Sequence, residues 1–156
     1  MLALVMTVGG WLSSPAFAQT AAEKAFVATG DAICQKSNER LAEKALSYER
    51  HRLITRRAAK SVNQRVAKPA DVAEFVSKVA ISEIEMQLNE LGSLKPAPSQ
   101  AVAFSAALKE ANRALDDIRT KPDQAAFRNP FQRSSKMFAA LGFRNCGQSE
   151  SRSKSV

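Results

Sequence analysis

The stretch SQAVAFSAALKEANRALDDIRTKP, residues 99–122, carries the most regular helical pattern of the chain. Its apolar side chains return every three or four residues, at Phe104, Leu108, Ala111, Leu115 and Ile118. This spacing places them on one face of an α-helix, which must be buried against another part of the protein. Ser99 is a predicted helix cap, and Thr120-Lys-Pro122 ends the pattern. The stretch therefore predicts an amphipathic helix that packs inside a larger helical domain.

Two further helices are predicted on its amino-terminal side. One runs from Pro69 to Gly92, because proline is favoured in the first turn of a helix and glycine provides a left-handed stop at its end. The other begins at Thr20, whose hydroxyl and the carboxylate of Glu23 have the spacing of a capping box. If that helix ran on unbroken towards the next, it would be about 70 Å long at 1.5 Å per residue. That is twice the length of its neighbours, so a break is expected around residues 45–50.

The last helical region follows on the carboxyl side, with Phe127, Phe131, Phe138 and Leu141 on one side of it. Asn129-Pro130 interrupts this region, either as a kink or as the cap and first residue of the final helix. No long run alternates apolar and polar residues with period two, so no strand is predicted. We therefore expect residues 19–146 to form an all-α domain, a four-helix up-and-down bundle, and the Ser-rich residues 147–156 to form a disordered polar tail.

Residues 1–18 have the layout of a cleavable secretory signal peptide. An uncharged apolar run, Leu2 to Leu12, is followed by the small-residue triplet Ala16-Phe17-Ala18. No basic residue precedes the run, so either the amino terminus supplies the charge or the natural start lies upstream of Met1. A short buried helix is the alternative, but it would have to contain two glycines and a proline. We expect cleavage before Gln19, a periplasmic or secreted location, and no transmembrane segment in the mature chain.

The two cysteines, Cys34 and Cys146, lie near opposite ends of the expected mature chain. In an oxidising compartment such an even pair most simply forms one disulfide, here between the first helix and the C-terminal segment. A metal site would need more ligands than these cysteines and the single histidine, His51, provide in this spacing. A catalytic thiol is disfavoured as well, because each cysteine has an obvious partner.

Two short motifs resemble those of a group of small exported bacterial helical proteins. They are C-x-x-x-N followed by R-L, from Cys34 to Leu41, and L-G-F-x-x-C, from Leu141 to Cys146. In that group an early helical cysteine and a cysteine after the final helix frame a bundle of similar length. The resemblance implies a disulfide-framed bundle and carries no known activity. This chain lacks the lipid-acceptor cysteine of the lipoprotein-like members, so a membrane tether is not implied.

The chain is basic, with 23 Lys and Arg against 15 Asp and Glu and a formal net charge of +8. Residues 36–68 hold ten of the basic side chains and three Glu, whereas residues 69–92 hold one Lys and five acidic residues. Seven basic side chains make up the candidate basic strip: Arg50, Arg52, Arg56, Arg57, Lys60, Arg65 and Lys68. Such a strip can bind an anionic partner, although the pattern alone favours a solvated face balanced by the acidic second helix.

No catalytic constellation is found in the sequence. Asp116 and Asp117 are adjacent on a predicted helix and point about 100° apart, so they cannot share a substrate proton. The serines lie outside any nucleophile-elbow motif, and glycine-rich phosphate loops and haem-attachment motifs are absent from the sequence. The sequence therefore predicts a protein that is not an enzyme and has neither a cofactor nor a metal.

The sequence supports two hypotheses about function. The leading one is an exported accessory protein whose basic strip contacts an anionic envelope polymer, lipid headgroups or an acidic protein. Export disfavours nucleic acid as this partner, and only Tyr48 offers a ring for base stacking near the strip. The alternative is a carrier of a small apolar molecule, with the ligand surrounded by Phe104, Phe127, Phe131 and Phe138 in the bundle interior.

Overall fold

The computed structural model describes residues 19–58 and 69–146, and this part of the chain is helical and contains no strand. Its α-helices are α1 (Ala21–Ala58), α2 (Pro69–Phe75), α3 (Ile81–Gly92), α4 (Ala101–Thr120) and α5 (Gln132–Ala140). A π-helical turn, η1 (Val76–Ala80), joins α2 to α3, and a 3₁₀ turn, η2 (Pro122–Ala126), follows α4. The all-α class predicted from the sequence is confirmed for these residues.

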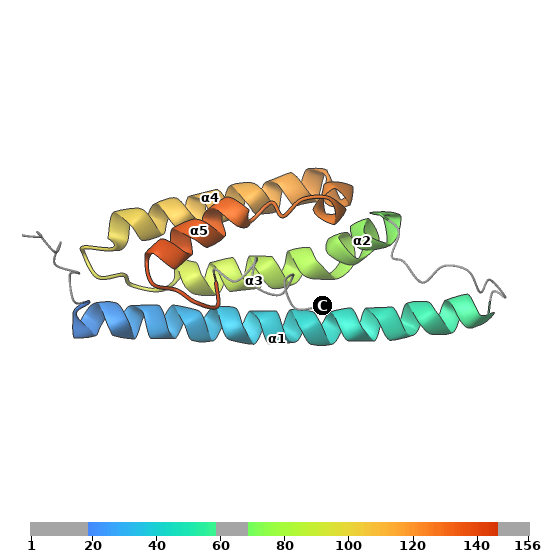
Figure 1. Cartoon of the computed structure of the whole chain (residues 1–156), viewed down its shortest axis with the longest axis horizontal. Coiled ribbons are helices and arrows are strands. Elements are labelled where there is room, and N and C mark those ends of the chain that lie inside the picture. Colours follow the sequence, from blue (N-terminus) through green and yellow to red (C-terminus); the bar gives the residue numbers. More distant parts are fainter. Residues whose placement is uncertain (1–18, 59–68, 147–156) are drawn as a thin grey trace, which may run out of the picture.

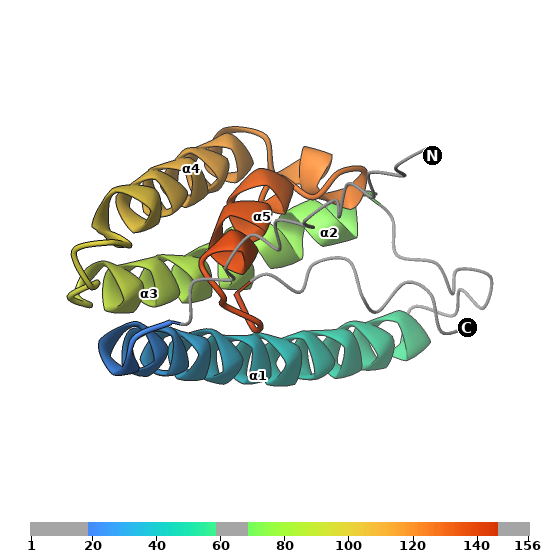
Figure 2. The same cartoon turned by 60° about the vertical axis from the view of Figure 1, so that its left-hand side comes forward.

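α3 packs between α1 and α4, and α5 packs against α4 (Figure 1). In both views α2, η1 and α3 form one nearly continuous rod that runs antiparallel to α1, and α4 runs back beside α3 (Figure 2). The shorter α5 crosses obliquely against α4, and α1 continues beyond the end of α2. The carboxyl end of α1 therefore lies at the margin of the packed helices.

The start of α1 is the predicted capping box. The backbone N–H of Thr20 donates to Oε2 of Glu23 at 2.7 Å, and the N–H of Glu23 donates to Oγ1 of Thr20 at 3.2 Å. The predicted break at residues 45–50 is wrong, because α1 is continuous as far as Ala58. No Gly or Pro occurs in residues 45–50 to end the helix, and the ring of Tyr48 packs against that of Phe75 with centroids 5.4 Å apart.

The second predicted helix begins at Pro69 and ends at Gly92, as the sequence indicates. Within it, the N–H of Ile81 donates to the carbonyl oxygen of Val76, a bond that reaches across five residues and defines the π-helical turn η1. The predicted left-handed stop at Gly92 is wrong, because Ser93 after it remains right-handed at φ −81° and the described glycine with positive φ is Gly142, at 97°. Gly142 performs the role expected of glycine just past the end of α5.

The predicted cap of the third helix is also wrong. Gln100 precedes α4 and no side chain caps its amino end. The hydroxyl of Ser99 instead donates to Oε1 of Glu23 at 2.5 Å, which ties the start of α4 to the start of α1. The carboxyl end of α4 at Thr120 agrees with the prediction.

Neither alternative for Asn129-Pro130 is right as stated, because α5 begins at Gln132, the residue in the cap position is Phe131, and no side chain caps the helix. The N–H of Phe131 donates to Oδ1 of Asn129 at 2.9 Å, a local turn that precedes α5. Pro130 stays outside the helix, which begins at Gln132. The final helix is therefore shorter than the apolar pattern suggests, because η2 and this turn occupy its expected first half.

The centre of the core is a cluster of four phenylalanine rings from α1, α4, α5 and the segment after α5. Its members are Phe26, Phe104, Phe138 and Phe143, all buried. Ring centroids lie 4.8 Å apart for Phe26 and Phe104 and 5.7 Å apart for Phe138 and Phe143, in edge-to-face arrangements. The apolar stripes predicted from helical periodicity meet in this cluster, which fixes the relative positions of the helices.

Cys34 and Cys146 form a disulfide, with their sulfur atoms 1.95 Å apart. Cys34 is fully buried on α1, and Cys146 follows the end of α5. The adjoining segment is also held by Asp31 of α1, whose carboxylate accepts backbone N–H groups of Arg144 and Asn145, each at 2.8 Å from Oδ1. The predicted link between the first helix and the C-terminal segment is therefore present.

Candidate functional site

Little of the candidate basic strip lies within the described side chains. Arg50 is exposed on α1. The structure also places Arg52, Arg56 and Arg57 in α1, but their side chains lie outside the described part, as do Lys60, Arg65 and Lys68 entirely. The structure therefore describes one side chain of the basic strip, that of Arg50, and for three further members only the helical backbone of α1.

The four phenylalanines proposed to surround a ligand do not enclose a common space. Phe104 and Phe138 belong to the packed ring cluster, whereas Phe127 is 75% exposed in the turn after η2. Phe131 is partly buried at the start of α5. The expected Phe-lined interior is wrong in this form, because the η2 turn carries Phe127 away from the face that α5 buries.

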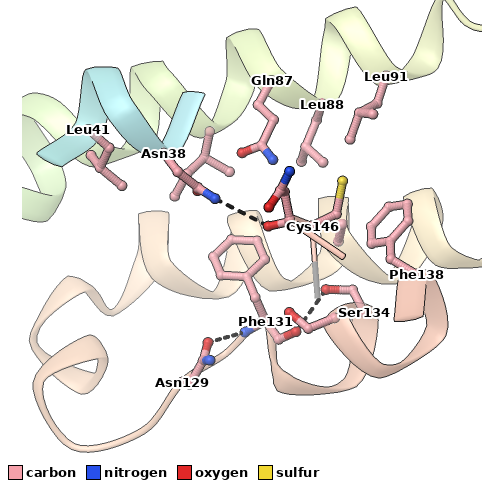
Figure 3. Close-up of a pocket in the computed structure, with 14 residues that line it drawn as sticks. Asn38, Leu41, Gln87, Leu88, Leu91, Asn129, Phe131, Ser134, Phe138 and Cys146 are labelled. Atoms are coloured by element: carbon pink, nitrogen blue, oxygen red, sulfur yellow. Dashed lines mark hydrogen bonds between the residues drawn. The ribbon is translucent and has the colours of Figure 1, made fainter. Parts of the chain in front are cut away.

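An open pocket of about 290 Å³ lies beside the disulfide instead (Figure 3). Its apolar lining consists of Leu41, Ile84, Leu88, Leu91, Ala111, Phe131 and Phe138. Its polar lining consists of the amides of Asn38, Gln87, Asn129 and Asn145 and the hydroxyls of Ser134 and Ser135. Cys146 of the disulfide completes the wall. Sites for small molecules commonly combine a mainly apolar surface with a few placed polar groups.

Helical spacing explains why these residues share one pocket. Ile84, Leu88 and Leu91 recur at intervals of three and four along α3, with Gln87 beside them. Ser134, Ser135 and Phe138 repeat the same spacing on α5. Asn38 and Leu41 on α1 are three residues apart, so three helices each turn one face toward the pocket.

Several polar groups of the pocket are held by the protein itself. Nδ2 of Asn38 donates to the carbonyl oxygen of Asn145 at 3.2 Å. Nε2 of Gln87 lies 2.9 Å from Sγ of Cys34, and the hydroxyl of Ser134 donates to the carbonyl oxygen of Phe131 at 3.0 Å. These bonds fix the pocket wall where the C-terminal segment meets α1 and α3.

None of the described residues that line the pocket has a charged side chain. The nearest buried charge on α3 is Glu83, 2% exposed, whose carboxylate accepts a hydrogen bond from Nε of Arg40 at 2.9 Å and another from Nζ of Lys44. These bonds, that of Lys44 above all, lower the pKa of Glu83 from its ordinary value of 4.5, against the raising effect of burial. This triad joins α3 to α1, so its role in the described structure is to position the two helices.

Gln87, Ser134 and Ser135 are pocket residues that the sequence does not single out. A signal for them exists, because each interrupts an apolar face at helical spacing. The same signal marks Glu83, which stands among Val76, Ala80 and Leu91 on the buried face of the η1–α3 rod. A polar residue in such a position is either paired in the core or faces a cavity.

The lining offers apolar contacts and hydrogen bonds and holds neither an acid nor a base. Within residues 19–58 and 69–146 no three His, Cys, Asp or Glu side chains gather closely enough to hold a metal ion. Over the same ranges no helix combines the length and the apolar composition that a membrane span requires.

Comparisons of the chain with protein-family models, curated proteins and solved structures find no match.

Proposed function

We propose that this chain is an exported, non-enzymatic binding protein that holds a small molecule in the pocket beside its disulfide. The observation that carries the proposal is the pocket of about 290 Å³ whose wall is assembled from α1, α3, α4, α5 and the C-terminal segment. The proposal includes an up-and-down four-helix bundle in which α2, η1 and α3 count as one helix. The carrier hypothesis is thus retained, but the ligand is placed in this pocket and not among the four phenylalanines predicted from the sequence.

Export rests on the signal pattern of residues 1–18 and is supported by the disulfide, since such bonds persist in oxidising compartments. The intact mass of protein recovered from the exported fraction tests it. We expect a chain that begins at Gln19 and that contains no Trp, because Trp11 lies in the removed segment. A mass that still includes residues 1–18 would contradict cleavage. The resemblance to small exported helical proteins belongs to the same proposal.

Native mass spectrometry of the exported protein tests the binding function. We expect a retained small molecule on the wild-type protein and its loss from Ser135→Leu, which places a larger side chain in the pocket. Ser105→Leu, on an exposed position of α4, is the matched control and should retain the molecule. Equal occupancy of both variants would show that the pocket is not the site.

The second candidate function is binding of an anionic envelope polymer, lipid headgroups or an acidic protein by the basic strip. The unbroken course of α1 favours it, because Arg50, Arg52 and Arg56 then share one helix that extends past α2. The triple variant Arg56→Gln, Arg57→Gln and Lys60→Gln should abolish salt-sensitive binding to phosphatidylglycerol vesicles.

The control for this second test removes equal charge elsewhere. Lys24, Lys36 and Lys109 are exposed and form no ion pair with other described residues, so their change to Gln leaves the described ion pairs intact. Equal losses from both triple variants would mean that net charge alone explains vesicle binding, and the strip would then be a solvated face.

A further inference from the structure

We propose that the pocket beside the disulfide selects uncharged ligands that have an apolar ring and one hydrogen-bonding group, such as a hydroxyl, an amide or an amine N–H. This inference deepens the proposed function and rests on it, because it names the ligand class of the same pocket. It follows from what the pocket wall contains and from how the nearby charges are engaged.

A charged ligand would find no counterion among the described residues that line this pocket. Several charged side chains on neighbouring segments have partners within the protein: Nε of Arg40 and Nζ of Lys44 contact Glu83, and Nη2 of Arg40 lies 3.9 Å from Glu90. The carboxylate of Asp31 accepts backbone N–H groups of Arg144 and Asn145. Moving an ion out of water into an apolar site without a partner is strongly unfavourable. The pocket therefore discriminates against charge while it accepts an apolar group.

Two polar groups on opposite walls remain able to bind a ligand. The hydroxyl of Ser135 on α5, a residue only 7% exposed, makes no hydrogen bond to other described residues. Nε2 of Gln87 on α3 is directed to Sγ of Cys34, so its carbonyl oxygen Oε1 stays open to the pocket (Figure 3). A group that both donates and accepts, such as a hydroxyl or a primary amide, satisfies the two sides at once.

The apolar part of the ligand is accommodated by aromatic and branched side chains. The rings of Phe131 and Phe138 and the side chain of Leu88 border the pocket (Figure 3). Aromatic side chains favour offset or edge-to-face contact with another ring. The volume of about 290 Å³ is at the lower limit of usual ligand sites, so a ligand of no more than about three rings is the appropriate size.

A pair of fluorescent probes that differ by one charged group tests the inference. N-phenyl-1-naphthylamine is neutral, and 8-anilino-1-naphthalenesulfonate has the same ring skeleton with a sulfonate added. Titrated into the oxidised full-length protein at raised ionic strength, the neutral probe should bind at one per chain, and the sulfonate about tenfold more weakly or less. Ser135→Leu should abolish binding of the neutral probe, and Ser105→Leu should leave it unchanged.

A variant that adds a positive charge to the pocket wall tests the selection against charged ligands directly. Gln87→Lys should raise the affinity for the sulfonate relative to the neutral probe by about tenfold, whereas Asn89→Lys, exposed on the same helix, should not alter the ratio. Circular dichroism and thermal unfolding establish that each variant is folded.

The possible results separate the inference from the proposed function. If both probes bind equally and Ser135→Leu removes both, the pocket binds ligands but the selection against charge is wrong. If neither probe binds the wild-type protein, or if a folded Ser135→Leu variant binds both normally, the result contradicts the proposed function and therefore also the inference.

Discussion

At Gly30, α1 passes so close to the ring of Phe143 that a larger residue does not fit. A Cβ at this position would lie 3.1 Å from Cδ1 and Cζ of Phe143 and would overlap Cε1. The ring cannot move aside easily, because Phe143 is 2% exposed and packs against Phe26 and Phe138. Glycine at this point of a helix is therefore explained by packing rather than by backbone conformation.

Gly30→Ala should destabilise the protein even though alanine is the better helix former. Overpacking costs about 1–3 kcal/mol, and the overlap with a ring that cannot move places this position in the upper part of that range. After the gain of about 1 kcal/mol in helix propensity, we expect a net loss of about 1–2 kcal/mol in the free energy of unfolding. Urea denaturation measures the difference. Gly92→Ala is the matched control, because nothing lies within 4 Å of a Cβ there, and it should be neutral or stabilising. An increase in stability for both variants would contradict the close packing at Phe143.

Glu83 gives the stability a defined dependence on pH. Its pKa is lowered in the folded protein, first by Lys44 and then by Arg40. The carboxylate of Glu83 therefore takes up a proton more readily in the unfolded chain than in the folded protein. Its ion pairs stabilise the fold fully above pH 4.5, the ordinary carboxyl pKa, and this stabilisation is lost as the pH falls through the lowered pKa of the folded state. Glu83→Gln should lower the free energy of unfolding by about 1–3 kcal/mol at neutral pH. The free energy of unfolding of this variant should also fall less steeply than that of the wild-type protein as the pH is lowered. Chemical denaturation at several pH values measures both, with exposed Glu43→Gln as the control.

At the residue scale, local sequence predicts local contacts and misses distant ones. The capping box of Thr20 and Glu23 is predicted because both partners lie within one helical turn. The role of Ser99 is missed because its partner, Glu23, is 76 residues away and competes with the local cap. The burial of Glu83 is missed for the same reason, since its cationic partners are on α1.

At the element scale, the helices of the described chain agree with periodicity, while their irregularities do not follow from it. The rod from Pro69 to Gly92 has the predicted ends, but the π-helical turn η1 within it has no composition signal. A turn of this kind holds one more residue than an α-helical turn, since its hydrogen bond spans five residues. η1 therefore takes up one residue more than a regular α-helical turn would, and Val76 and Ala80 at its two ends are both buried.

Deletion of Ser77, exposed within η1, should convert this turn to regular α-helix while α2 and α3 keep their packed faces. We expect a modest change in melting temperature. Deletion of Lys109, exposed within α4, is the control, because it rotates the remainder of that regular helix by about 100° and removes Ala111, Leu115 and Ile118 from the core. Calorimetry and circular dichroism measure the outcome. Equally severe unfolding by the two deletions would contradict a role for η1 in absorbing one residue.

At the scale of the whole molecule, the pocket could be predicted only in part. Its apolar residues belong to stripes that the sequence shows clearly, such as Leu88 and Leu91 on α3. A cavity remains among these residues because α5 crosses α4 obliquely and because Asn145 and Cys146 form part of the wall. Periodicity states which face of a helix is buried, but it does not state how completely the facing helices fill the space.

Removal of the disulfide should weaken both the fold and the pocket. The double variant Cys34→Ser and Cys146→Ser opens a link between residues 112 positions apart. A loop of that length contributes up to about 4.7 kcal/mol in the chain-entropy model and commonly about 2–4 kcal/mol in measurements, so the melting temperature should fall by several degrees. Binding of the neutral probe should weaken too, because Asn145 and Cys146 form part of the wall. Wild-type protein in reductant is the control, and free thiols in non-reducing peptide maps would contradict the bond.

The same bond turns the helical domain into a covalent ring. The backbone from Cys34 to Cys146 and the bridge between their sulfur atoms form a closed circuit that contains α2, η1, α3, α4, η2 and α5. A single broken peptide bond inside that circuit changes a ring into a linear chain and releases nothing. A protease therefore has to cut twice within the ring, or once in the company of a reductant, before any piece of these helices can diffuse away.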